Sequence, residues 1–206
     1  MRDIIEAIEN LLVSTSMHGG EAKDSADILL ESIPWRKKPI AVEPRTFPVV
    51  EQRLEEACSS HGALGGNAQT LTNAVMAARD ELAWVTPWGE YLEHADMAAL
   101  VQNFAFTTII GPGHPLEADG VLIGLSLQGP DLHYPMHAHQ AGETYWIVGG
   151  DADWKIGMEP WFSVIPGSIC VHQPGMRHAM QTNARPLLTV WAWWSHIDSN
   201  IVMIRG

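Results

Sequence analysis

Three histidines and one glutamate carry the most specific chemical signal in this 206-residue sequence. Residues two apart on a β-strand face the same side, so His137 and His139 are predicted to point into one interior. A short turn just before Glu143 would let that carboxylate enter from the next strand. His178 follows a Pro-Gly turn and is predicted to open another strand. Imidazole and carboxylate groups suit first-row divalent metals, so the four side chains are predicted to hold one metal ion inside a small β-barrel.

The other histidines lack this context. His133 and His172 lie close to the two ligand motifs and are candidates for groups that support the ligands from behind. The remaining five are interpreted as solvated or structural, and they are His18, His61, His94, His114 and His196.

Aromatic side chains are predicted to surround the metal. Tyr145 follows Glu143 by two residues and should project into the same interior, and Tyr134 lies three residues before the first ligand. Trp193 belongs to the last predicted strand, and Trp191 shares its face by alternation. A metal beside aromatic rings suits a small zwitterionic substrate, because the metal can take a carboxylate while the ring faces attract an onium cation.

The elements that must position these residues change in type near residue 100. Apolar residues recur at helical spacing over residues 4–12 and 71–82, with shorter helical candidates at 26–33 and 49–58. Later segments read as short strands separated by Gly and Pro breaks, and they span residues 107–110, 121–127, 143–148, 152–156, 162–165 and 187–194. We therefore predict a helical region over residues 1–100 that packs on a β-barrel formed by residues 101–206. The helices are short and apolar on one side, and they are expected to cover the barrel mouth.

Composition narrows the class of partner. The formal net charge is −12 at pH 7, which disfavours nucleic acid and anionic membrane surfaces as partners. The two cysteines are far apart and do not suggest a disulfide. Acidic residues interrupt the N-terminal segment, which therefore does not read as a secretion signal, and a cytoplasmic protein is expected. The oligomeric state is left open by the sequence.

The two ligand motifs resemble those of the cupin family. The run His-x-His-x-x-x-Glu leading to Gly150 resembles the first cupin motif, and the segment from Gly167 through Pro-Gly-x-x-His to Asn183 resembles the second. The spacing departs from the usual one at Gly129 and Asn183, which concerns turns and leaves the ligand positions intact. The resemblance implies a double-stranded β-helix, or jelly-roll, barrel with a metal inside it.

Within the cupins, the sequence most closely resembles the cupin-type dimethylsulfoniopropionate lyases, and among them the short Q-type enzymes. The resemblance rests on Tyr-Pro-x-His-x-His-x-x-x-Glu-x-Tyr, on Pro-Gly-x-x-His and on the Trp-rich final strand, over roughly residues 130 to 196. It implies β-elimination to dimethyl sulfide and acrylate. It also implies that His139, Glu143 and His178 bind the metal, with His137 at the remaining cupin ligand position.

The same resemblance implies that Tyr145 is the general base, and that Tyr134 and Trp193 line the substrate site. The chemistry is reasonable on its own terms, since a phenol beside a divalent cation loses its proton more readily. The metal stays open among zinc, iron(II), manganese, cobalt and nickel, because a mixed N/O ligand set accepts all of them. An Fe(II) cupin dioxygenase and a non-enzymatic metabolite-binding cupin are the two alternative interpretations.

Overall fold

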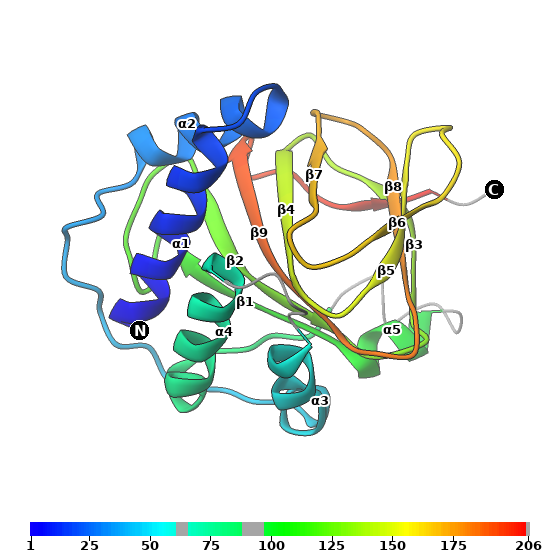
Figure 1. The fold of residues 1–206 in the computed structure, drawn as a ribbon, viewed down its shortest axis with the longest axis horizontal. Coiled ribbons are helices and arrows are strands. Elements are labelled where there is room, and N and C mark those ends of the chain that lie inside the picture. Colours follow the sequence, from blue (N-terminus) through cyan, green and yellow to red (C-terminus); the bar gives the residue numbers. More distant parts are fainter. Residues whose placement is uncertain (61–65, 88–96, 205–206) are drawn as a thin grey trace.

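Helices precede strands along the chain, as the change in periodicity predicts (Figure 1). The computed structural model describes residues 1–60, 66–87 and 97–204, so His61 and His94 lie outside the described residues.

Apolar residues of α1, among them Ile4, Ile8 and Leu12, form one buried stripe. Pro48 occupies the first turn of α3, where its missing N–H costs nothing. The helices are α1 (Arg2–Ser16), α2 (Glu21–Ser32), α3 (Pro48–Ser59), α4 (Asn67–Ala77), the 3₁₀ turn η1 (Arg79–Glu81) and α5 (Ala98–Asn103).

Ten described strands form two antiparallel five-stranded sheets that face each other, the double-stranded β-helix of the cupin fold. The first sheet has the order β1-β2-β9-β4-β7 and the second has the order β10-β3-β8-β5-β6. The predicted fold class is therefore confirmed, although the two-residue strand β10 was not among the predicted strands. The strands are β1 (Phe104–Ile110), β2 (Leu122–Gln128), β3 (His133–Ala138), β4 (Gly142–Gly149), β5 (Ala152–Ile156), β6 (Phe162–Val164), β7 (Ile169–His172), β8 (His178–Thr182), β9 (Leu187–Ser195) and β10 (Val202–Met203).

The outer face of the first sheet carries the larger apolar core. Helices α1 to α4 pack there, so that residues such as Leu12 and Leu71 join Val190 and Trp146 in one buried cluster (Figure 1). Gly149 allows α3 to approach β4 closely, because a Cβ at this position would collide with the Ala57 carbonyl oxygen. Helices α1 to α4 thus lie against the outer face of this sheet, and the expectation that the N-terminal region covers the barrel mouth stays a prediction. The outward side chains of the first sheet are apolar on nearly every strand, and that face offers the helices more apolar surface to bury.

The space between the sheets holds a second, smaller core. Trp154, Met180 and Leu187 pack there together with Met97 and Leu100 of the segment around α5. Tyr134, Tyr145 and Trp191 belong to the same cluster, so the aromatic residues singled out in the sequence point inward.

Two further expectations concern cysteines and membranes. Cys58 and Cys170 are both buried and free, as the sequence predicts. Over the described part of the chain, every helix is too short or too polar to cross a lipid bilayer.

Candidate metal centre and substrate cavity

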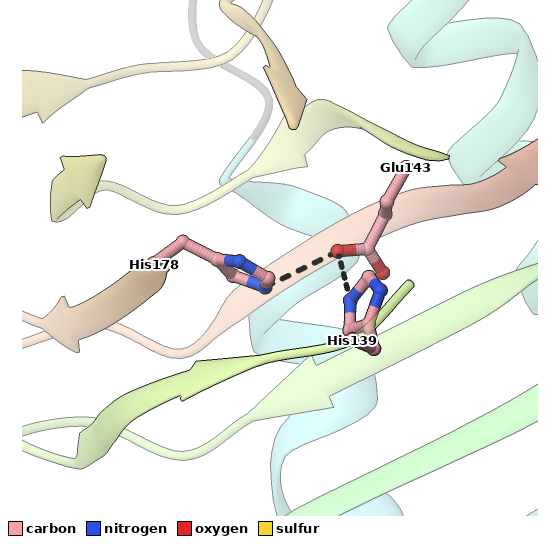
Figure 2. A group of neighbouring side chains, drawn as sticks. All are labelled: His139, Glu143 and His178. Carbon is pink, nitrogen blue, oxygen red and sulfur yellow. Dashed lines mark hydrogen bonds and ion pairs between the residues drawn. The ribbon is translucent and has the colours of Figure 1, made fainter. Parts of the chain in front are cut away.

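Three of the four predicted ligands converge between the sheets (Figure 2). Glu143 lies on β4 of the first sheet, His178 opens β8 of the second, and His139 follows directly after the end of β3. All three are buried, and one potential ligand atom from each lies within 4.8 Å of the others. His139 Nε2 is 3.1 Å and His178 Nε2 is 3.3 Å from Glu143 Oε2. Among the described residues this cluster could hold a metal ion.

The tautomers of these histidines show that the cluster suits a cation. The Nδ1 atoms of His139 and His178 lie 3.0 Å from the carbonyl oxygens of Ala141 and Met176. A carbonyl oxygen only accepts, so each Nδ1 carries a hydrogen and each neutral ring presents the lone pair of Nε2 to Glu143. In their neutral forms the two rings direct lone pairs at a carboxylate oxygen, and this arrangement requires a cation, either a proton on one of the rings or a metal ion. A divalent metal ion fits this donor set.

His137 stands beside the cluster. It is buried, its Nδ1 donates to the Pro135 carbonyl oxygen over 2.8 Å, and its ring stacks on Tyr134 with centroids 4.1 Å apart. Its ring centroid is 4.1 Å from that of His178 and 6.4 Å from that of His139. Strand β3 has a register irregularity between residues 134 and 137 and ends before residue 139. The regular alternation expected for His137 and His139 therefore does not hold, and only His139 joins the three-residue group.

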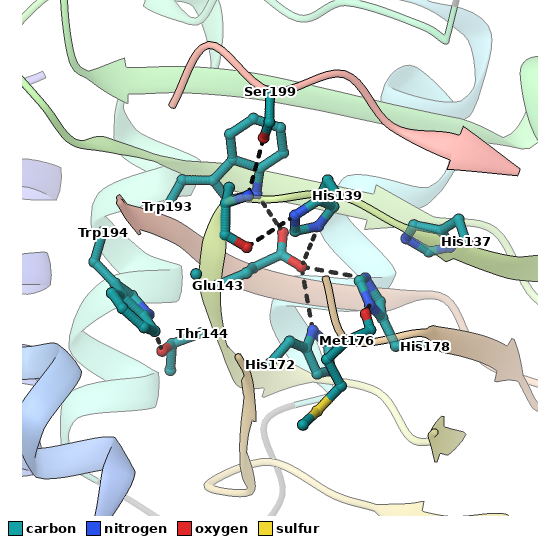
Figure 3. Close-up of polar contacts among 12 residues, drawn as sticks. His137, His139, Glu143, Thr144, His172, Met176, His178, Trp193, Trp194 and Ser199 are labelled. Carbon is teal, nitrogen blue, oxygen red and sulfur yellow. Dashed lines mark hydrogen bonds and ion pairs between the residues drawn. The ribbon is translucent and has the colours of Figure 1, made fainter. Parts of the chain in front are cut away.

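Two further N–H donors contact the carboxylate of Glu143 (Figure 3). The indole N–H of Trp193 donates to Oε1 over 2.8 Å, and the Nδ1 of His172 lies 3.2 Å from Oε2. Both contacts follow from strand register, since Glu143 is paired with Trp193 on β9 and with His172 on β7. One of the two candidate supporting histidines, His172, thus contacts the candidate ligand Glu143. The other, His133, is exposed and lies against Trp161.

The electrostatics of the cluster favour an ionised carboxylate. Burial opposes ionisation of Glu143, but hydrogen bonds from His139, His172 and His178 hold its pKa well below the ordinary value. Burial lowers the pKa of His139, but the hydrogen bond and charge of Glu143 outweigh it, so the pKa is raised. Burial and then the nearby His178 lower the pKa of His172 to about 3 and that of His137 well below 6.5. Neutral imidazoles beside a carboxylate are the form in which these groups bind metals.

A cavity of about 790 Å³ opens beside the cluster. Tyr134, Tyr145, Trp191 and Trp193 line it, together with Phe104, Phe106 and residues 199–202 of the C-terminal segment. Trp193 thus contacts the cluster and the cavity at once. The described part of the lining contains no Lys, Arg, Asp or Glu. The indole N–H of Trp191 is buried, and the described residues offer it no hydrogen-bond acceptor.

Comparison with known protein families identifies the family of this chain. A family model for dimethylsulfoniopropionate lyases matches residues 22–189, which include all but the first residue of α2, helices α3 to α5 and the whole candidate metal cluster. The chain belongs to the dimethylsulfoniopropionate lyase family. The family resemblance drawn from the motifs of residues 130–196 is confirmed, and the match extends well into the helical region.

Relatives of this family member support the same placement. The dimethylsulfoniopropionate lyase DddQ of Ruegeria pomeroyi is 28% identical over 160 residues, which cover 76% of this chain and 78% of the relative. The crystal structure of DddQ from Ruegeria pomeroyi has the same fold, with a TM-score of 0.70 at 21% identity over 98% of this chain and 95% of that one. A structure from work on the lyases RdDddP and RnDddQII superposes with a TM-score of 0.65 at 20% identity, over 96% of this chain and 100% of that one.

Some contacts of this dimethylsulfoniopropionate lyase family member were not apparent from sequence. Trp154 belongs to none of the motifs, yet its indole N–H donates to His172 over 3.0 Å. Ser199 likewise belongs to none of the motifs, and its hydroxyl accepts from the N–H of Ala141, two residues after the candidate ligand His139. No local motif marks either residue, because each contact joins strands or segments that are distant in the chain.

Proposed function

We propose that this protein is a metal-dependent carbon–sulfur lyase that cleaves dimethylsulfoniopropionate by β-elimination to dimethyl sulfide and acrylate. The observation that carries the proposal is the aromatic cavity beside the buried His-Glu-His cluster, in a chain that belongs to the dimethylsulfoniopropionate lyase family. A zwitterion needs an electrophile for its carboxylate and a soft, electron-rich surface for its sulfonium. The described lining supplies rings and contains no Lys or Arg that would compete for the carboxylate.

The metal would be held by His139, Glu143 and His178. His137 is the candidate for a fourth ligand. A divalent cation there would take the substrate carboxylate and stabilise the negative charge that develops as the α-proton leaves. Zinc, iron(II), manganese, cobalt and nickel all suit the donor set. Elemental analysis of a His139→Ala, His178→Ala double variant tests the assignment. We expect its metal content to collapse, whereas a folded variant with a full equivalent of metal would contradict it.

Aromatic faces would bind the sulfonium end. Tyr134 stacks on His137, Trp193 contacts His139, and both line the cavity, so a cation held against these rings would lie beside the candidate metal site. Trp191 lines the same wall, and its free indole N–H is suited to a carboxylate oxygen that the metal leaves unbound. All three side chains would therefore fix the orientation of the substrate.

Tyr145 would act as the general base, with Tyr134 as the second candidate. Tyr145 lines the cavity from β4, two residues beyond Glu143, and its ring centroid is 5.7 Å from that of His172. Its phenolate oxygen would take the α-proton, and the electron pair of that C–H bond would form the new C=C bond. The C–S bond then breaks with its electron pair leaving on sulfur, and neutral dimethyl sulfide needs no acid for its departure.

The deciding experiment is anaerobic. Purified protein, stripped of metal and reloaded with one metal at a time, is given dimethylsulfoniopropionate, and dimethyl sulfide in the headspace and acrylate in solution are measured. We expect the two products in equal amounts without O₂. An Fe(II) dioxygenase would instead consume O₂ and release no dimethyl sulfide, and a binding protein would retain the substrate unchanged. Either result would overturn the proposal.

A further inference from the structure

A buried chain of hydrogen bonds links the two sheets to the carboxylate of Glu143. Trp154 lies on β5 of the second sheet, and His172 lies on β7 of the first. The indole N–H of Trp154 is 3.0 Å from His172 Nε2, and His172 Nδ1 is 3.2 Å from Glu143 Oε2. Trp154 and His172 are both fully buried, and Glu143 is 3% exposed. Because all three side chains are buried, the donor and acceptor roles in these contacts are set by the side chains themselves.

In each of these two hydrogen bonds, the chemistry of the groups determines which one donates and which one accepts. An indole N–H can only donate, so Nε2 of His172 accepts and its hydrogen must sit on Nδ1. That Nδ1–H then points at Glu143 Oε2 as a donor (Figure 3). His139 and His178 have the same tautomer but the opposite placement, since they present Nε2 lone pairs to the same oxygen. His172 therefore faces the carboxylate with an N–H, whereas His139 and His178 face it with lone pairs when their rings are neutral.

We propose that His172, held in one tautomer by Trp154, is a positioning residue that orients the Glu143 carboxylate toward the metal. Its ring also stacks on that of His178, with centroids 3.8 Å apart and planes 19° apart, so one side chain restrains two of the ligands. Carboxylate ligands commonly depend on such partners behind them. The inference rests on the metal site of the proposed function, but not on the reaction proposed there.

The test measures zinc affinity of the full-length protein by competition with a chromogenic chelator, with no substrate present. His172→Phe keeps a ring but removes the donor, and we expect zinc affinity to fall about 10- to 100-fold. His172→Asn places an amide N–H near the position of Nδ1 and should recover most of the loss. Equal affinity in His172→Phe and wild type would overturn the proposal. Equally weak binding by the Phe and Asn variants would also overturn it, since ring packing would then be the cause.

Trp154→Phe tests the hydrogen bond from Trp154 to His172 and has a matched control. Trp84 is as deeply buried as Trp154, but its indole N–H has no partner among the described residues and it packs in the core beneath the helices. We expect Trp154→Phe to weaken zinc binding by about three- to tenfold and Trp84→Phe to leave it unchanged. Nitrogen-15 NMR of His172 supplies a readout that packing alone would not move. Nδ1 should be fully protonated in the wild type and lose that preference in Trp154→Phe, and an unaltered tautomer with unaltered affinity would refute the role of Trp154.

These measurements separate the inference from the lyase proposal. A protein that releases no dimethyl sulfide can still show the expected loss and recovery of zinc affinity. Conversely, an active lyase whose zinc affinity is unchanged by the substitutions at Trp154 and His172 would leave the proposed reaction intact and refute the positioning role. If His172→Phe does not fold, as judged by circular dichroism, the Trp154→Phe and His172→Asn variants decide the question by the same two readouts.

Discussion

The hydrogen bond from Trp193 to Glu143 makes a prediction whose size can be worked out. Trp193→Phe keeps an aromatic face toward the cavity and removes the indole N–H that lies 2.8 Å from Glu143 Oε1. The acceptor is a buried, ionised carboxylate, for which one hydrogen bond is worth about 1.5–3 kcal/mol. The unfolding free energy should fall by about that amount, and zinc affinity should fall by about 10- to 100-fold because the carboxylate loses a partner that orients it.

Trp194 provides the matched control for this change. It follows Trp193 on β9, is likewise partly buried, and donates its indole N–H over 3.2 Å to the neutral hydroxyl of Thr144. Trp194→Phe makes the same ring truncation and should cost about 0.5–1.5 kcal/mol for a neutral bond, with zinc affinity unchanged.

The assay for both variants is urea unfolding of metal-free protein together with chelator competition for zinc. The difference between the variants isolates the charge-assisted bond from the loss of ring area. Two variants that unfold alike and bind zinc alike would refute the claim that Trp193 supports the ligand. A Trp193→Phe enzyme with normal zinc affinity but a raised Michaelis constant would assign the residue to the substrate alone.

Three further predictions concern the base, pH and the helices. Tyr145→Phe should retain its metal and lose about 10²–10⁴-fold in turnover of dimethylsulfoniopropionate, whereas near-normal turnover would move the base elsewhere. The pKa values of His172, at about 3, and of His137, well below 6.5, are lower in the folded protein than in the unfolded chain. Protons therefore favour the unfolded chain, and stability of metal-free protein should fall as pH drops below about 6.5, by up to about 1.4 kcal/mol per pH unit for each histidine. His139, whose pKa is raised, offsets part of this loss; urea unfolding at pH 7, 6 and 5 measures the net slope, and a flat profile would contradict it. Deleting residues 1–60 should expose the apolar outer face of the first sheet and produce an aggregating protein, so a soluble and fully active truncation would count against the packing described here.

The sequence by itself determined the types of element and much of the candidate metal-binding cluster. Periodicity separates helices from strands because an apolar stripe recurs every three or four residues in one and every second residue in the other. A short turn links His139 to Glu143 as candidates. His178 joins them through its Pro-Gly turn and the resemblance to the second cupin motif, and the structure brings the three together. Inward placement of Tyr145 followed from its alternation with Glu143.

Tertiary structure alone decided which strands are neighbours and in what register. Periodicity tells which face a side chain occupies but not which side chain lies opposite, because that depends on packing between segments far apart in the chain. Pairing of β4 with β7 and β9 is what places His172 and Trp193 on the carboxylate of Glu143. The irregular end of β3 separates His137 from His139, and a side chain's exact place at a bulge is not encoded by alternation. The helices settled on the outer face of the first sheet for a similar reason, since the largest apolar surface exists only after the strands have assembled.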